Sequence, residues 1–147
     1  MGIAEVIGNV KAKMAMVTLS FEAIESSWRL KTDKTRLLQV INNLISNGVD
    51  AAADSAAKHV SVRVEARKDQ VVFRVVDSGA GLPSHIKQRL FEKFATSKSS
   101  SAGTGLGLSL SWEIMKKLGG ELRYVEGEPQ TTFEVICPSE TMHRLSA

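Results

Sequence analysis

The sequence predicts an α+β sandwich rather than a doubly wound parallel sheet, and three observations favour this fold class. Residues 59–67 alternate between apolar and polar side chains, and a second β-rich run follows at 70–76, which is typical of an antiparallel hairpin. A long amphipathic helix, expected within residues 33–55, would supply an apolar face to cover a sheet. The expected strands pair with their neighbours along the chain instead of alternating one by one with helices.

Length and composition exclude several classes of protein. The chain has 147 residues, enough for one domain with a real core, and its formal net charge of +3 is too small to indicate a nucleic-acid-binding face. Its one cysteine, Cys137, excludes an internal disulfide and a cysteine zinc cluster and favours a reducing compartment. We find neither an apolar run of about 18 residues nor a secretory signal. We therefore expect a cytoplasmic domain, either free or part of a membrane-bound protein.

The first half of the chain is expected to place a short helix at 4–15 and then two short strands within 17–31, joined by a polar turn. The long helix follows, with Asp33 as its N-cap, because an Asp side chain can accept a hydrogen bond from an amide of the first turn. The apolar face of this helix repeats every three or four residues and comprises Leu37, Leu38, Ile41, Leu44, Ile45, Gly48, Val49 and Ala52.

The second half is expected to begin with the hairpin, whose turn we place at Lys68-Asp69, and to end with another pair of strands. Loops and helices alternate between the two pairs. In order, these later elements are a turn-rich loop at 77–83, a short helix at 84–94 capped by Ser84, a mobile polar loop at 95–104, a helix at 105–118 ended by Gly119-Gly120, and strands at 121–126 and 131–137.

Amide side chains line one edge of the long helix. Gln39, Asn43 and Asn47 are four residues apart, a spacing that drifts only about 40° per step, and Asn42 adds a further amide. Amide oxygens can ligate a hard cation such as Mg²⁺, and neutral ligands suit a metal whose charge phosphates already balance. The alternative is a solvated polar edge, which helix spacing alone does not exclude.

The turn after the hairpin carries a hydrogen-bond acceptor followed by glycines. Asp77 ends the second β run, and Gly79 and Gly81 allow the backbone to approach a flat or phosphorylated ligand closely. Since an ionised carboxylate only accepts hydrogen bonds, Asp77 could select an exocyclic amine such as that of adenine. The alternative is a tight turn in which Asp77 is simply the turn residue.

A glycine-rich segment, GTGLGL at 103–108, opens the last helix, and exposed amides at a helix N-terminus attract phosphate. It is not a Walker A loop, and a dinucleotide fingerprint starting at Gly79 would need glycine where Ser84 stands. Lys93 and Lys98, which flank the polar loop, could contact a polyphosphate as point charges. The alternatives are a flexible connection and two solvated lysines.

The order of these signals resembles that in the catalytic, ATP-binding domain of bacterial sensor histidine kinases, within the GHKL ATPase superfamily. LLQVINNLISNGVDAA resembles the family's N box, VVDSGAGLP its G1 box, LFEKFATSK its F box, GTGLGLSL its G2 box, and TTFEVICP the strand with its last box. The resemblance covers about residues 33–138. Asp-Ala after the N-box asparagines and Ala-Thr-Ser-Lys in the F box are most similar to the nitrogen-regulator and oxygen-sensor branch.

The resemblance implies a two-layer α/β sandwich of the GHKL (Bergerat) type, with a mixed sheet and helices on one face. It implies that Asn43 and Asn47 hold Mg²⁺ and the phosphates of ATP, that Asp77 reads the adenine amine, and that a lid at about 95–104 covers the nucleotide. Lys98 would contact the phosphates and act with the two asparagines in catalysis. The other residues implied around the nucleotide are Gly79, Gly81, Phe91, Lys93, Phe94, Gly103, Thr104, Gly105, Leu106, Gly107 and Thr131.

The resemblance also implies how the chain is divided. Residues 17–140 would form the catalytic domain, 1–16 a linker or the end of a dimerisation domain, and 141–147 a tail. The γ-phosphate would pass to a histidine on a separate dimerisation domain, and a response regulator would be an indirect partner. None of the chain's own histidines has the expected helical His-Glu or His-Asp context; they are His59, His85 and His143. We expect neither a nucleic-acid partner nor direct membrane insertion.

Three positions depart from the family pattern. Gly48 and Gln130 stand where the family usually has Ala and Gly, and Ala95 stands where this branch often has Phe. Two other functions remain open. A GHKL ATPase would activate water with a Glu at the position of Asn43, and Asn cannot act as that base. A degenerate docking or nucleotide-sensing module of the same fold is the second alternative.

Overall fold

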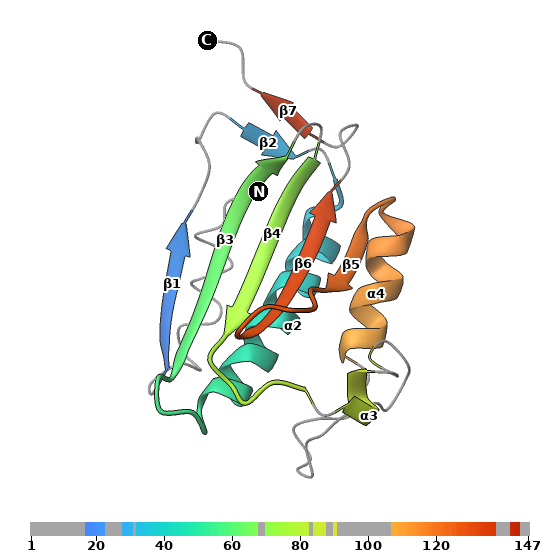
Figure 1. Ribbon diagram of the computed structural model, residues 1–147. Helices are drawn as coiled ribbons and strands as arrows, with labels where there is room; N and C mark the ends of the chain where they lie inside the picture. Colours follow the sequence, from blue (N-terminus) through green and yellow to red (C-terminus); the bar gives the residue numbers. More distant parts are fainter. Residues whose placement is uncertain are drawn as a thin grey trace.

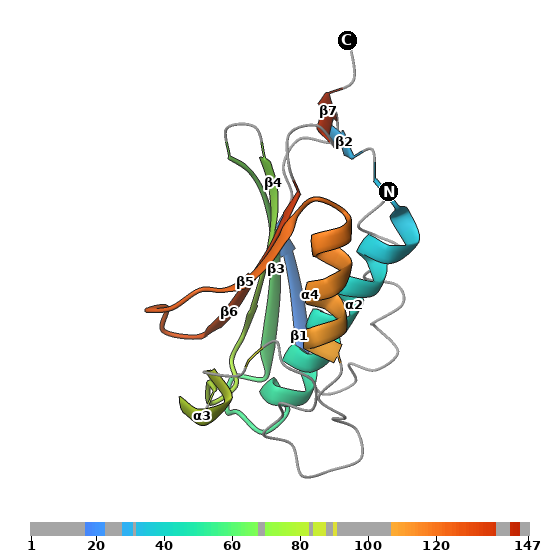
Figure 2. The same cartoon turned by 90° about the vertical axis from the view of Figure 1, so that its right-hand side faces the viewer.

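The computed structural model of the chain has two layers, a sheet and a pair of helices (Figure 1). Helix α2 spans Lys34–Ala52 and helix α4 spans Gly107–Lys117. Figure 2 shows that both helices cover the same face of the sheet, which confirms the expected α+β sandwich. The structure describes residues 17–22, 28–30, 32–67, 70–82, 84–87, 90, 107–137 and 142–144.

The main sheet has five strands in the order β1-β3-β4-β6-β5. Strand β3 pairs antiparallel with β4, β4 with β6, and β6 with β5, whereas β1 pairs parallel with β3. The sheet is therefore mixed, and both expected hairpins are confirmed. The strands span Thr18–Glu22 (β1), His59–Arg67 (β3), Gln70–Asp77 (β4), Glu121–Tyr124 (β5) and Thr131–Cys137 (β6).

The prediction that neighbouring strands pair is wrong for the first two. Strand β2, Trp28–Leu30, pairs antiparallel with β7, Met142–Arg144, in a separate two-stranded sheet. Strand β1 instead joins β3 in parallel, so β1, α2 and β3 form a crossover unit. The crossover lets α2 lie across the sheet and bury its apolar face there. Strand β7 was not predicted, because three residues are too few to show a periodic pattern.

Helix α2 begins as predicted, since Asp33 accepts a hydrogen bond at Oδ1 from the backbone amide of Arg36 at 3.1 Å. Its buried face matches the predicted one except that Leu38 is only partly buried and Val40 is buried in addition. This face packs against α4, β3 and β4. The core between the layers is mostly aliphatic, and the largest of its fully buried side chains is Phe73.

The described residues cover only part of two predicted helices. Helix α3 spans only Ser84–Lys87, so Ser84 is its first residue rather than its cap, while most of the remainder of the predicted 84–94 segment lies outside the described residues. Helix α4 is described from Gly107 and ends at Lys117, one residue before the predicted end, with Gly119 at φ +78° just beyond it. The helix predicted at 4–15 and the turn at 68–69 also lie outside the described residues.

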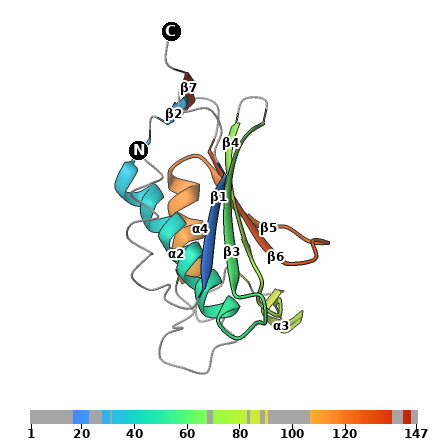
Figure 3. The ribbon, with the colours of Figure 1, turned by 90° about the vertical axis from the view of Figure 1, so that its left-hand side faces the viewer.

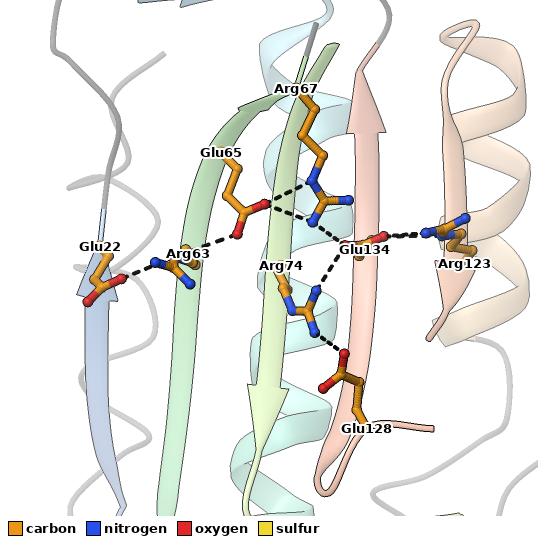
Figure 4. A network of polar contacts seen from close by, with 8 residues as sticks. All are labelled: Glu22, Arg63, Glu65, Arg67, Arg74, Arg123, Glu128 and Glu134. Carbon is orange, nitrogen blue, oxygen red and sulfur yellow. Dashed lines mark hydrogen bonds and ion pairs between the residues drawn. The ribbon is translucent and has the colours of Figure 1, made fainter. Parts of the chain in front are cut away.

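The face of the sheet away from the helices carries a ladder of charged side chains, which comprises Glu22, Arg63, Glu65, Arg67, Arg74, Arg123, Glu128 and Glu134 (Figure 4). At its centre Glu134 is only 1% exposed. It accepts hydrogen bonds from Arg67 at 2.8 Å, from Arg123 at 2.9 Å and from Arg74 at 3.4 Å. Every strand of the main sheet contributes to the ladder, which therefore ties the five strands together.

None of the helices in the described part of the chain is long and apolar enough to cross a membrane.

Candidate functional site

Four separate elements supply the candidate site, and the C-terminal ends of α2 and β4 lie at the lower end of the molecule in Figures 1 and 3. Asn43 is the middle residue of α2 and Asn47 lies one turn later, while Asp77 ends β4, Thr131 begins β6 and Gly107 begins α4. All five are candidate residues from the sequence. The fold therefore gathers segments that are far apart along the chain.

Asp77 is buried where β4 ends, with its side chain on the helix side of the sheet. It is 6% exposed, and its Oδ1 accepts a hydrogen bond from the backbone amide of Gly79 at 2.8 Å. A Cβ at Gly79 would lie 2.9 Å from the Cβ of Ala51, closer than ordinary contact. Glycine is therefore required at this position for the turn to pack against the last residues of α2.

Thr131 completes this part of the site from the neighbouring strand. It pairs with Asp77 in the register of β4 and β6, and it is also 6% exposed. Gly81, with φ +89°, lies beside it, since a Cβ there would be 4.0 Å from Thr131 Oγ1. The structure thus brings Asp77, Gly79, Gly81 and Thr131 together, as the sequence analysis expected.

Asn43 lies where α2 and α4 meet. Its Nδ2 donates a hydrogen bond to the hydroxyl of Ser111 on α4 at 3.0 Å. A Cβ at Gly107 would lie 2.7 Å from Nδ2 and 2.9 Å from Oδ1 of Asn43, so the amide lies directly against the backbone where α4 begins. A side chain at position 107 would displace this amide.

Asn43, Asn47 and Ala51 form one stripe along α2, because residues four apart lie on the same side of a helix. The stripe contacts α4 at Asn43, and it contacts the Asp77 turn at Ala51, which packs on Gly79. Asn47 lies between these two contacts. The stripe therefore joins the two halves of the candidate site.

Two serines that the sequence analysis did not single out anchor the Asp77 turn. The hydroxyls of Ser55 and Ser78 are 2.7 Å apart. Ser55 Oγ donates to the carbonyl of Ala52 at 2.8 Å, and Ser78 Oγ accepts from the amide of His59 at 2.8 Å. Since each hydroxyl has one proton, Ser78 must donate to Ser55. The resulting chain of hydrogen bonds ends on the carbonyl of Ala52, the last residue of α2, which also accepts from the backbone amide of Ser55 at 3.0 Å.

The amides of α2 are suitable ligands for a hard cation. Among the described residues, no group of three or more His, Cys, Asp or Glu side chains could hold a metal ion. Oδ1 of Asn42, about 100° around α2 from Asn43, is buried without a hydrogen-bond partner but is not part of the stripe of candidate residues. Neutral oxygen donors fit a Mg²⁺ ion that arrives with phosphate ligands of its own.

The other predicted site residues lie outside the described residues, and their roles stay predictions. They are Phe91, Lys93, Phe94, Lys98, Gly103, Thr104, Gly105 and Leu106. Of the departures from the family pattern, the structure explains how Gly48 is accommodated. A Cβ at position 48 would make ordinary contacts of 3.4 Å with the Cβ of Asp77 and 3.5 Å with Val60, so Ala would fit there too.

Comparisons with known proteins agree with this architecture. The sequence profile of the family described as histidine kinase-, DNA gyrase B- and HSP90-like ATPase matches residues 32–141. The sensor kinase CckA of Brucella abortus (strain 2308) is 38% identical over 128 residues, which cover 76% of this chain and 13% of that protein. The chain thus spans about an eighth of that relative's length.

Solved structures of histidine kinases share the fold. The catalytic domain of histidine kinase ThkA superposes with a TM-score of 0.79 at 28% sequence identity, covering 93% of this chain and 90% of that one. The structure of ThkA in complex with the response regulator protein TrrA gives a TM-score of 0.76 at 26% identity, covering 93% of this chain and 39% of that one.

Proposed function

Because the chain belongs to the family of histidine kinase-, DNA gyrase B- and HSP90-like ATPases, we propose that it is the ATP-binding catalytic domain of a two-component sensor histidine kinase. The observation that carries this proposal is the stripe of Asn43, Asn47 and Ala51, which runs from the start of α4 to the turn that follows Asp77. An elongated ligand with a base at one end and phosphates at the other fits such an arrangement.

Asp77 would receive the exocyclic amine of adenine, because a carboxylate accepts hydrogen bonds and an amine donates them. The tight turn at Gly79 lets the backbone pass close to the base. Asn43 and Asn47 would hold Mg²⁺ and the phosphates through their amide oxygens. A bound Mg²⁺ would offset the negative charge that gathers on the phosphates during transfer. Lys98 would add a positive charge from the segment we expect to form a lid.

The chemical step would be phosphoryl transfer to a histidine on a separate dimerisation domain. An imidazole nitrogen would attack the γ-phosphorus, the bond from that phosphorus to the β–γ bridging oxygen would break, and ADP would leave. Such a transfer depends on positioning and charge neutralisation more than on covalent help from the protein. Asn43 supports transfer over hydrolysis, because an amide cannot take a proton from water.

The same proposal divides the chain into segments and gives it a partner and a compartment. Residues 17–140 would be the catalytic domain, with 1–16 as a linker from the dimerisation domain and 141–147 as a tail. A response regulator would receive the phosphoryl group in turn; the structural neighbour ThkA forms a complex with the response regulator protein TrrA. The domain would work in the cytoplasm, where ATP is available.

Calorimetric titration of the purified chain with ATP, with and without Mg²⁺, tests the proposal. We expect saturable binding that strengthens with Mg²⁺. Asp77→Asn should weaken binding roughly 100-fold, since a hydrogen bond to a charged group contributes about 1.5–3 kcal/mol. The matched control is Asp54→Asn, which makes the same change at an exposed position after α2 and should leave binding unchanged. Absence of binding at millimolar ATP would favour the degenerate docking module instead.

A further inference from the structure

Ser111 is a polar residue in an apolar position. It lies on the buried face of α4 together with Ile114 and Met115, and it is 1% exposed. A hydroxyl in such a place must be hydrogen-bonded, because an unsatisfied buried polar group costs about 1–3 kcal/mol. Its partner is the side chain of Asn43, whose Nδ2 lies 3.0 Å from Ser111 Oγ.

The contact with Ser111 occupies one end of the Asn43 amide. Nδ2 is engaged by the hydroxyl, so Oδ1 is the end that can act as a ligand. Gly107 lies one turn before Ser111 on α4 and packs closely against the same amide. A Cβ at position 107 would be only 2.9 Å from Oδ1 of Asn43. Two residues of α4 therefore restrict the amide, one through a hydrogen bond and the other through close packing.

We propose that Ser111 is a positioning residue that fixes the Asn43 amide with its oxygen available to Mg²⁺. The proposal rests on the function proposed above and adds a residue to it. Because Ser111 belongs to α4 and Asn43 to α2, metal binding would also depend on the packing of α4 against α2.

Calorimetry on the 147-residue chain tests this role. ATP binding is measured in saturating Mg²⁺ and again in EDTA for the wild type, Ser111→Ala, Asn43→Ala and the double variant. We expect Ser111→Ala to weaken binding about tenfold in Mg²⁺, the factor that corresponds to about 1.4 kcal/mol, and to leave binding in EDTA unchanged. In the Asn43→Ala background, Ser111→Ala should have no further effect, because its partner is already absent.

Control variants separate positioning from general destabilisation. Thr132→Val removes another buried hydroxyl, which donates to the Gln130 carbonyl at 3.0 Å on the far face of the sheet; it should lower stability without changing the Mg²⁺ dependence. Ser111→Thr, which keeps the hydroxyl, should restore most of the affinity. Urea titration shows whether Ser111→Ala is folded. If it is not, Ser111→Cys fills the same space with only a weak hydrogen-bonding group and should show the same loss of ATP affinity in Mg²⁺.

Two results would overturn the role of Ser111 while leaving the proposed function intact. One is a wild type that binds Mg·ATP and a Ser111 variant that binds equally well. The other is an equal loss of affinity with and without Mg²⁺, which would indicate a structural role only. A wild type that does not bind ATP in either condition would instead refute the proposed function itself.

Discussion

Two buried carboxylates lie in neighbouring strands but on opposite faces of the sheet, and the fold satisfies them differently. Glu134, 1% exposed, accepts hydrogen bonds from arginines on β3, β4 and β5. Asp77, 6% exposed, accepts one from the backbone of Gly79, two residues further along the chain. The first carboxylate is neutralised by distant side chains, whereas the second is held by a local turn.

The difference separates a stabilising role for Glu134 from the binding role proposed for Asp77. Burial alone would raise the pKa of Glu134, but hydrogen bonds from Arg67 and Arg123 outweigh it and lower the pKa below its ordinary value. Glu134 therefore stays ionised and links the strands. The Asp77 turn also packs against α2 at Ala51, a member of the stripe that includes Asn43 and Asn47. We therefore expect substitution of Glu134 to lower stability and leave ATP affinity unchanged, and substitution of Asp77 to act mainly on ATP affinity.

Glu134→Ala should give the largest loss of stability. Removing one member of a buried ion pair costs about 3–5 kcal/mol, and we expect about 3 kcal/mol because the arginines are partly exposed and can regain water. Urea unfolding measures this loss, and ATP affinity should remain that of the wild type. Glu22→Ala, at the exposed end of the same ladder, is the matched control and should cost under about 0.5 kcal/mol. Equal losses at both positions would refute the contrast.

Protonation of Glu134 at low pH should lower the free energy of unfolding by less than Glu134→Ala does. A group whose pKa is lowered by folding contributes stability above its unfolded pKa, about 4.3 for Glu, and that contribution is lost as the pH falls through the lower folded pKa. The free energy of unfolding should therefore decline below about pH 4.3. Glu134→Gln should flatten this decline, because it removes the titrating group. An unchanged acid slope in Glu134→Gln would show that other carboxylates cause the decline.

Ser55→Ala should have the smallest effect and should affect both properties. It leaves the hydroxyl of Ser78 without its acceptor and the amide of Lys58 without the 3.0 Å contact that it makes with Ser55. We expect a loss of about 1 kcal/mol in stability and a few-fold weaker ATP binding, since the Asp77 turn loses its anchor. Ser20→Ala, on the exposed side of β1, is the control. A stability loss with unchanged affinity would show that the anchor is not needed for binding.

The same contrast explains what the sequence could predict. Asp77 and Gly79 are close in the chain and follow a clear β run, so local pattern identified them. The Glu134 partners Arg67 and Arg74 are separated from it by 67 and 60 residues, and only the strand register brings them together. No motif or spacing along the chain records that register.

Ser111 and Ser55 were missed for different reasons. Ser111 left a signal, a polar residue at a position of α4 that helical spacing assigns to the buried face, but its partner on α2 could not be identified without the packing of the two helices. Ser55 left none, because serine is ordinary after a helix. The parallel pairing of β1 with β3 was also hidden, since it depends on the path of α2 across the sheet.

The charged ladder has a consequence for the protein in concentrated solution. A sheet that is covered on one face only presents its other face to every copy of the same molecule, and an apolar face of that kind promotes association. Here that face carries arginine and glutamate side chains from β1 at one edge to β5 at the other (Figure 4). Stacking two such faces would remove fixed charges of both signs from water, which costs free energy even where they form ion pairs. The ladder thus makes self-association through this face unfavourable.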